Sequence, residues 1–217
     1  MTGHMEREIG RLKKSILALA AVVEESVKQA VIALEKRDVE LAKKIIKGDL
    51  AVNQREVELE EECLKIIALH QPVAADLRFI VAVLKINNDL ERIGDLAANL
   101  AERTVSLVEN QAQQAPFDFE LMADKVELML EKALDALVNH DLMLASEAIR
   151  LDDEVDQMHK DAFAAIKAGI REDPEAMDAL INYLSISRYL ERIADLATNI
   201  AEDVVYMING KIVRHIL

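Results

Sequence analysis

The stretch LERIGDLAANLAE occupies residues 90–102, and LERIADLATNIAE occupies residues 190–202. Ten of the thirteen positions are identical, and the step between the two stretches is one hundred residues throughout. Apolar residues recur within each stretch at spacings of three and four, which predicts an amphipathic helix. Because domains commonly contain about 100 to 150 residues, a repeat of this length in a chain of 217 residues predicts two similar halves.

The composition indicates the type of secondary structure. Apolar residues make up 52% of the chain, but aromatic residues only 3%, so the core must consist of Leu, Ile, Val, Ala and Met. Six Gly and three Pro leave few places for turns, which favours long elements rich in helix-forming residues. We therefore predict an all-α fold.

The apolar pattern divides the first half into three helices. A seam with spacings of three and four begins at Ile9 and predicts a first helix that ends near Gly48. A second helix is predicted over residues 49–70 and a third over residues 75–110, with a turn at Gln71–Pro72.

The second half repeats this plan after the non-periodic segment at residues 109–117. ALEKRDVELA at residues 33–42 corresponds to ALVNHDLMLA at residues 136–145. Because an amphipathic helix cannot bury its apolar stripe alone, each half is predicted to form a three-helix bundle. The expected domains are two tandem, similar bundles at residues 6–110 and 117–210.

Acidic residues are paired on the repeated helices. Glu91 and Asp95 lie four residues apart and share one face of the helix, roughly opposite the apolar seam, as do Glu191 and Asp195. Surface acids are usually only solvated. However, like charges at this spacing destabilise a helix by a few tenths of a kcal/mol, so their occurrence in both halves requires a reason.

The preceding helix of the first half carries a second polar pair, Asp49 and Asn53. Asp49 lies 23 residues before Pro72 and Asp95 lies 23 residues after it, while Asn53 and Glu91 are each 19 residues from it. Residues equally far from the turn of an antiparallel hairpin lie at the same height. The two pairs are therefore predicted to meet.

The same count holds in the second half. Asp152 and Asp195 are equally far from the Asp173–Pro174 turn, and so are Asp156 and Glu191. Concentrated negative charge of this kind needs a cation between the carboxylates. We therefore predict one metal site in each half: the first-half patch of Asp49, Asn53, Glu91 and Asp95, and the second-half patch of Asp152, Asp156, Glu191 and Asp195.

Oxygen ligands favour hard or borderline divalent or trivalent ions, such as Mg, Ca, Mn or Fe, and Zn remains compatible. His159 is a candidate for one nitrogen ligand, although a lone His is more often a surface residue or one with a protein partner. Because the second-half patch has four carboxylates and the first-half patch has three plus Asn53, we predict tighter metal retention in the second half.

Charge, cysteine content and apolar run length limit the partners, the covalent links and the location that this protein can have. Forty Asp and Glu against 26 Lys and Arg disfavour nucleic acid and anionic lipid as direct partners. Cys63 is the only cysteine, which excludes an intramolecular disulfide and indicates a quiet, buried thiol. No apolar run approaches the length of about 20 residues that a membrane span needs, so a cytosolic location without membrane insertion is expected.

The two halves, each with a D-x-x-x-D/N pair followed by an LERI-x-DLA helix, resemble the PhoU family of bacterial phosphate-signalling regulators. The resemblance extends from about residue 6 to residue 210 and includes ADLRFIVAVLKINNDLERIGD at residues 75–95. It implies two spectrin-like bundles and multinuclear metal clusters at the two patches, where Asn53 departs from the pattern by replacing a carboxylate with an amide.

The resemblance also implies the partners and the role. The implied role is to restrain the phosphate-starvation response. The implied partners are the ATPase of the phosphate ABC transporter and a membrane sensor histidine kinase, which the protein would link. The resemblance also implies self-association, expected here as a homodimer. Such partners would recruit a cytoplasmic protein to the inner face of the membrane.

Two alternatives compete with a regulator. A carboxylate-bridged metalloenzyme would place Glu-x-x-His pairs inside the bundle, whereas Gly94 or Ala194 stands at the third position after Glu91 or Glu191. No nucleophile–base pair or phosphate-binding glycine loop is recognisable, so no enzyme is predicted. The second alternative is a plain helical scaffold whose acids serve only solubility. Chelators would then leave its structure and its partner binding unchanged.

Overall fold

The computed structural model describes residues 3–110 and 115–210, and within these ranges every regular element is helical. The all-α prediction is confirmed. The elements are α1 (Gly3–Lys36), α2 (Val39–His70), α3 (Ala74–Glu109), α4 (Phe119–Asn139), α5 (Leu142–Glu172), the short 3-10 helix η1 (Pro174–Ala176) and α6 (Met177–Asn209).

The turn between the first two helices lies earlier than predicted, because α1 ends at Lys36 and not near Gly48. Gly48 is inside α2, and the chain reverses at Arg37, which has a positive φ of 53°. Asp38 then caps α2, because its side chain accepts a hydrogen bond of 3.0 Å from the backbone N–H of Leu41. The apolar spacing continues across this two-residue turn, so periodicity alone could not locate it.

The second half turns in the same way. His140 has a φ of 54°, and the Asp141 side chain accepts hydrogen bonds from the backbone N–H groups of Met143 and Leu144. The segment shared by residues 33–42 and 136–145 thus encodes a turn and a helix cap. The predicted boundary between the halves includes residues 111–114, which lie outside the described residues.

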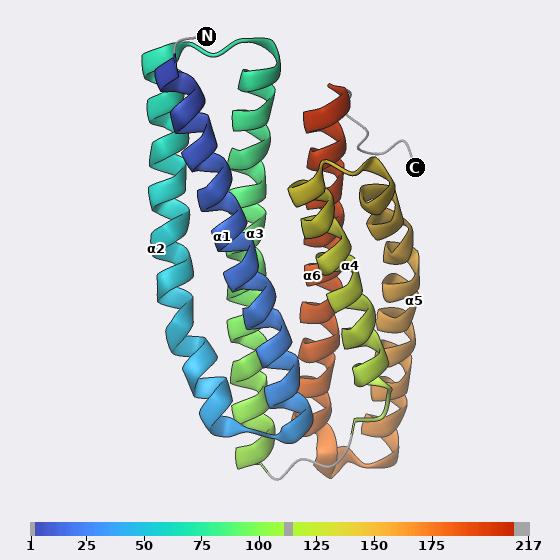
Figure 1. The fold of residues 1–217 in the computed structure, drawn as a ribbon. Coiled ribbons are helices and arrows are strands. Elements are labelled where there is room, and N and C mark those ends of the chain that lie inside the picture. The colour runs from blue at the N-terminus through green and yellow to red at the C-terminus, as the bar shows by residue number, and fades with distance from the viewer. Residues whose placement is uncertain (1–2, 111–114, 211–217) are drawn as a thin grey trace.

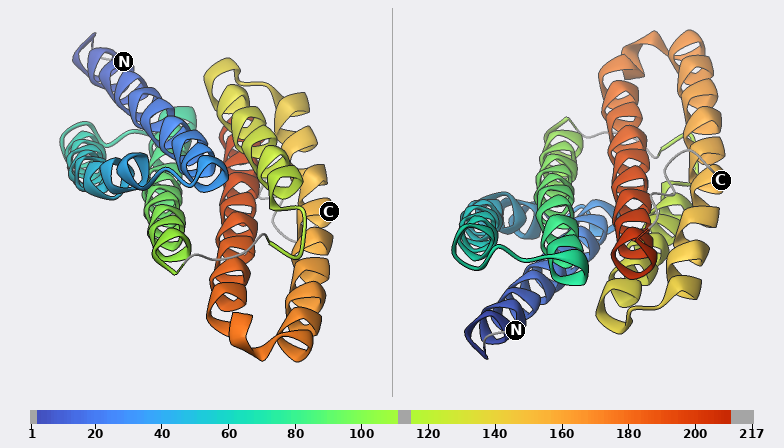
Figure 2. Two further views of the ribbon diagram at one scale, coloured as in Figure 1. Left: turned by 90° about the horizontal axis from the view of Figure 1, so that it is seen from below. Right: turned by 90° about the horizontal axis from the view of Figure 1, so that it is seen from above.

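The two halves pack as antiparallel copies. Helices α3 and α6 lie side by side at the centre and run in opposite directions, while α2 and α5 form the two outer edges (Figure 1). Helices α1 and α4 cover α3 and α6 from one common side (Figure 2). No helix of the described residues covers the opposite side of the α3–α6 pair (Figure 2).

The repeated stretches have the same pattern of exposure in both halves. Leu90, Ile93 and Leu100 are buried, as are their counterparts Leu190, Ile193 and Ile200. Within each stretch, the acids four residues apart are half-buried at the first position and exposed at the second. The duplication therefore preserves both a buried seam and an acidic face.

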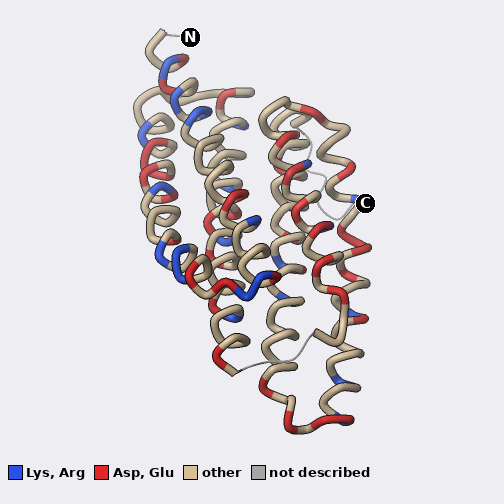
Figure 3. The backbone as a smooth tube through the Cα atoms, turned by 60° about the horizontal axis from the view of Figure 1, so that its bottom comes forward, with Lys and Arg blue, Asp and Glu red and all other residues tan. Residues whose placement is uncertain are grey.

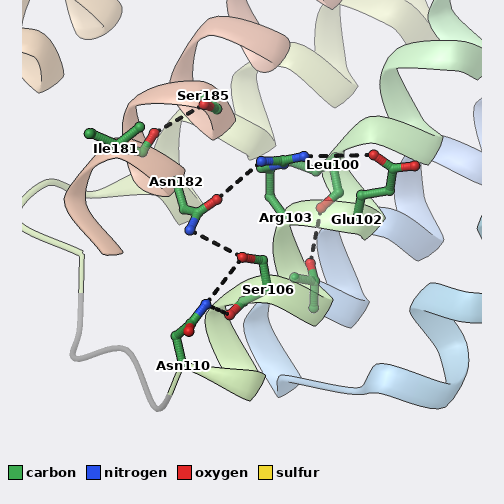
Figure 4. A network of polar contacts seen from close by, with 9 residues as sticks. Leu100, Glu102, Arg103, Ser106, Asn110, Ile181, Asn182 and Ser185 are labelled. Atoms are coloured by element: carbon green, nitrogen blue, oxygen red, sulfur yellow. Dashed lines mark hydrogen bonds and ion pairs between the residues drawn. The ribbon is translucent and has the colours of Figure 1, made fainter. Parts of the chain in front are cut away.

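Polar contacts fix α3 against α6. Near one end, Lys85 Nζ lies 3.0 Å from Oδ1 of Asp203, which is 2% exposed. Near the other end, Arg103 Nη1 donates to Asn182 Oδ1 at 3.3 Å, and Asn182 Nδ2 donates to Ser106 Oγ at 3.2 Å (Figure 4). Because these contacts lie on either side of the repeated motifs, they hold the two acidic faces in a fixed relation.

Cys63 is a buried free thiol, as predicted, and burial raises its pKa to about 12. Since only the thiolate reacts readily, we expect negligible alkylation of the native protein by iodoacetamide at pH 8 and rapid alkylation after unfolding in urea. Mass spectrometry distinguishes the two results. Fast labelling of the native chain would contradict this packing.

None of the helices in the described ranges combines the length and apolarity needed to cross a membrane.

Candidate metal centres

The first-half patch forms where α2 packs against α3. Asn53 Nδ2 donates to Asp49 Oδ2 at 3.1 Å on α2. Burial, and then the charge of Asp95 on α3, raise the pKa of Asp49, and the hydrogen bond from Asn53 opposes this shift. The pKa of Glu91 is also raised, by burial and by the charges of Asp95, Glu56 and Asp49. The acids of the two helices therefore meet here.

A glycine permits this approach. A Cβ atom on Gly94 would lie 3.1 Å from Val52 Cγ1 and 3.5 Å from Asp49 Oδ1. The missing side chain lets α2 pack closely against α3 and brings Asp49 towards the acids of that helix. The second half has Ala194 at this position.

Two oxygen atoms of the first-half patch lack protein partners. Asp49 Oδ1 and Asn53 Oδ1 are buried from solvent without a hydrogen bond. Most buried polar atoms are satisfied, so two unsatisfied oxygens beside carboxylates indicate a place for a cation or water. Asn53 donates through its nitrogen, and its oxygen remains available as a ligand. The departure from a carboxylate at this position is thus compatible with metal binding.

The second-half patch is the more compact of the two. Asp156, Glu191 and Asp195 each offer a carboxylate oxygen, and these oxygens lie within 4.8 Å of one another. Asp152 accepts a hydrogen bond of 3.2 Å from Thr198 Oγ1 on α6. Three of the four predicted residues of this half therefore meet between α5 and α6, and the charges of Asp156 and Glu191 reach the fourth, Asp152.

Crowding changes the acidity of this patch. Burial, followed by the charges of Glu191, Asp152 and Asp156, raises the pKa of Asp195 to about 6. Burial also raises the pKa of Asp152, against the effect of its Thr198 hydrogen bond. The ion pair at this patch is weak, because Lys160 Nζ lies 3.5 Å from Asp156 Oδ2 and its side chain is largely exposed.

His159 points to a different partner. Its Nδ1 atom lies 3.1 Å from Ser187 Oγ. His159 does not belong to the group of candidate metal ligands that lie within 4.8 Å of one another. It sits on α5 one turn beyond Asp156, towards the tip of the hairpin.

Sequence reasoning missed two residues that act on the patches, Glu56 in the first half and Thr198 in the second. Glu56 adds a carboxylate whose charge reaches Glu91, and its position seven residues after Asp49 on the same helical face could have signalled it. With Glu56 counted, each half has four carboxylates, which removes the charge difference behind the predicted tighter retention in the second half. No sequence pattern indicated Thr198, because Ala98 is its counterpart in the first half.

The donor set fits a metal ion. Acidic positions recur along the helices of both halves (Figure 3), and the acids of adjacent helices meet at both patches. Carboxylate and amide oxygens are the ligands that hard cations prefer. A bound cation would offset the mutual repulsion that raises the pKa of these carboxyl groups. The arrangement can therefore hold metal.

Replacing Asp195 by Asn should stabilise the metal-free protein at pH 7. The folded-state pKa of Asp195, about 6, exceeds its ordinary value of 3.8. The folded state therefore binds more protons between these values, and its stability falls as the pH rises through this window. After allowance for solvent screening of an exposed group, the gain is about 1 kcal/mol at pH 7.

Urea unfolding of chelator-treated protein measures this effect. The difference between variant and wild type should shrink as the pH falls towards 3.8. Asp161→Asn is the matched control, because Asp161 is an exposed acid on α5 outside the patch. A variant less stable than wild type at pH 7 would show that the repulsion is already relieved without metal.

Comparison with known proteins gives the family. The model of the PhoU domain matches residues 16–104 and again residues 119–204. The phosphate-specific transport system accessory protein PhoU homolog of Pseudomonas aeruginosa is 38% identical over 96% of this chain and 87% of that protein. The Aquifex aeolicus homolog is 36% identical over 96% of this chain and 95% of its own length.

Two crystal structures have the same fold. PhoU from Pseudomonas aeruginosa superposes with a TM-score of 0.91 at 36% identity, over 95% of this chain and 99% of that one. The phosphate transport system regulatory protein PhoU from Streptococcus pneumoniae gives 0.87 at 33% identity, over 96% and 98% of the respective chains. The domain is matched twice, and these relatives are similar over almost the whole chain. The chain therefore belongs to the PhoU family.

Proposed function

We propose that this protein regulates phosphate uptake and restrains the phosphate-starvation response, by linking the ATPase of the phosphate ABC transporter to a sensor histidine kinase. Membership of the PhoU family is the observation that carries the proposal. Its relatives are named as an accessory protein of the phosphate-specific transport system and as a regulatory protein of phosphate transport. A non-enzymatic role agrees with these names.

The site of action follows from the partners. The protein works in the cytoplasm as a homodimer and reaches the inner face of the membrane through its contacts with transporter and kinase. We assign partner contact to the surface at the two acidic patches, which lie between α2 and α3 and between α5 and α6.

Each patch holds metal in this proposal, with Fe, Zn, Mn or Mg as the candidate ions. The protein ligands are Asp49, Asn53, Glu91 and Asp95 in one half and Asp152, Asp156, Glu191 and Asp195 in the other. Metal would neutralise the repelling carboxylates and would clamp α2 to α3 and α5 to α6. Support comes from the unpartnered oxygens of Asp49 and Asn53 and from the three carboxylates that meet in the second half.

Neutralising the acidic faces tests the regulatory role. The variant with Glu91→Gln, Asp95→Asn, Glu191→Gln and Asp195→Asn should express phosphate-starvation genes in phosphate-rich medium, while its circular dichroism stays helical. A control with four exposed acids neutralised elsewhere should repress normally: Glu61→Gln, Glu109→Gln, Asp135→Asn and Asp161→Asn. Normal repression by the patch variant would show that these carboxylates are not needed for signalling.

A single substitution tests the second site. Asp156→Asn removes one of the three carboxylates that meet within 4.8 Å, so the metal content per chain should fall. Elemental analysis after purification without chelators measures it. An unchanged metal content would exclude Asp156 as a ligand.

A further inference from the structure

A cavity of about 330 Å³ lies at the junction of the two halves. It is found where α1 and α3 end and where α4 and α6 begin, at the lower end of the molecule in Figure 1. Leu34 and Leu107, which are both buried, contribute to its apolar wall. Small-molecule sites usually measure about 300 to 1,000 Å³. Because this cavity is at the lower limit, it suits a single inserted side chain better than a large ligand.

Aromatic side chains gather in this cavity. The chain has only four Phe, three Tyr and no Trp, yet Phe117, Phe119 and Tyr183 all line it. The ring centroids of Phe119 and Tyr183 are 6.5 Å apart, with an angle of 29° between the ring planes. The Arg37 side chain donates a hydrogen bond to the Tyr183 hydroxyl and holds that ring in place. Aromatic rings attract cations and planar groups to their faces.

Two carboxylates beside these rings lack a basic partner. Glu35 at the end of α1 and Glu120 at the start of α4 line the cavity, and no described lysine or arginine forms an ion pair with either. Burial, followed by the charges of Glu120 and Asp124, raises the pKa of Glu35. Asp118 also lines the cavity, but its carboxylate caps α4. A cation placed here would relieve the repulsion between the acids.

The acidic surface extends beyond the cavity along α1 and α4. Burial raises the pKa of Glu127 on α4, and the charge of Lys28 opposes this shift. The charges of Asp124, Glu35 and Glu24 add to it. Lys28 is itself paired with Glu24 at 2.9 Å. Because the negative surface is longer than the cavity, it complements a basic protein segment better than a small cation.

The internal repeat does not account for this chemistry. When the halves are aligned on their repeated segments, Glu35 corresponds to Val138 and Tyr183 corresponds to Val83. The bundle therefore forms in one half without an acid or a ring at these positions. The acid and the ring are features of the cavity and not of the duplicated fold.

We propose that this cavity is a docking site for an arginine side chain of a partner protein. A guanidinium group is planar and permanently charged, so it can stack on a ring and pair with a carboxylate through two N–H groups at once. A lysine ammonium is a compact point charge without this planar fork. The site lies apart from the metal patches on α2–α3 and α5–α6, so the inference goes beyond the proposed function and does not depend on it.

Peptide binding tests the proposal. The probe is a fluorescently labelled peptide of sequence Gly-Gly-Arg-Gly-Arg-Gly-Gly, titrated with the full-length protein and followed by fluorescence anisotropy. We expect saturable binding that becomes at least about fivefold weaker when lysine replaces both arginines. Citrulline keeps the shape of arginine and lacks its charge, so the citrulline peptide should hardly bind.

Three variants of the protein locate the binding. Glu35→Gln/Glu120→Gln removes the unpaired charges and should weaken binding of the arginine peptide by about tenfold. Phe119→Leu keeps an apolar side chain but removes one ring, so the preference for arginine over lysine should fall. The matched control is Glu60→Gln/Glu61→Gln, which makes the same change of charge at exposed acids of α2 and should leave binding unchanged.

The docking site is overturned if wild type shows no saturable binding of the arginine peptide, or if Glu35→Gln/Glu120→Gln binds it as tightly as wild type. Equal affinities for the arginine and lysine peptides would reduce the effect to general attraction by an acidic surface and overturn the choice of arginine. If the Glu35→Gln/Glu120→Gln variant instead loses self-association in sedimentation, the occupant is a second copy of this chain and not another protein. Should Phe119→Leu lose helical structure, Phe117→Leu takes its place. None of these measurements depends on bound metal, so the proposed function is tested separately.

Discussion

Replacing Lys85 by Met should lower the free energy of unfolding by about 2 to 4 kcal/mol. Lys85 Nζ is 3.0 Å from Asp203 Oδ1, and the Asp203 side chain is almost fully buried. Loss of the cation leaves a buried carboxylate without its ion-pair partner, which is costlier than loss of the same contact at the surface. The Lys85 side chain is 38% exposed, which places the effect below that of a fully buried pair.

Urea unfolding at pH 7 measures the loss. Lys43→Met is the matched control, because Lys43 makes an exposed contact of 3.5 Å with Glu40 and should change stability by less than about 0.5 kcal/mol. Combining Lys85→Met with Asp203→Asn should recover part of the loss, since the buried charge that has lost this cation is also removed. Equal small effects for both lysines would mean that the pair contributes little to the α3–α6 contact.

Metal binding should raise the stability of the folded protein at pH 7. A ligand that binds only the folded state contributes about 2.7 kcal/mol at a concentration one hundred times its dissociation constant. Each kcal/mol corresponds to about 2 to 4 °C in the melting temperature of a chain of this size. Adding Mn²⁺ to chelator-treated protein should therefore raise Tm by several degrees, because cations relieve the crowding around Asp195 and Asp49.

The effect should depend on the patches. The variant with Glu91, Asp95, Glu191 and Asp195 neutralised should melt at the same temperature with and without Mn²⁺. Matched additions of NaCl control for general screening of the acidic surface. If the variant responds to Mn²⁺ as strongly as wild type, the stabilising ions bind elsewhere.

Sequence predicted the fold through the repeat. The spacing of Leu90, Ile93 and Leu100 and of their counterparts defined a buried seam, and the scarcity of Gly and Pro implied long helices. The error at Gly48 arose because apolar periodicity does not change at a two-residue turn. Asp38, followed by Leu41, was the usable signal, since a side-chain cap marks where a helix must begin.

The heights of the acidic pairs could also be calculated from the sequence. Counting residues from each hairpin turn placed Asp49 with Asp95 and Asp152 with Asp195, and the electrostatic effects between these groups agree with that arrangement. Side-chain orientation could not be obtained in this way. The hydrogen bond from Thr198 to Asp152 is visible only in the three-dimensional structure.

The most direct measurement of the central claim is the metal content of protein purified without chelators and without a polyhistidine tag. Two double variants test the contribution of each helix to metal binding. Asp49→Asn/Asp152→Asn removes carboxylates from α2 and α5, and Asp95→Asn/Asp195→Asn removes them from α3 and α6. If adjacent helices hold metal jointly, wild type carries bound metal and both variants lose most of it. Wild type without metal, or either variant with the full wild-type content, would contradict the account.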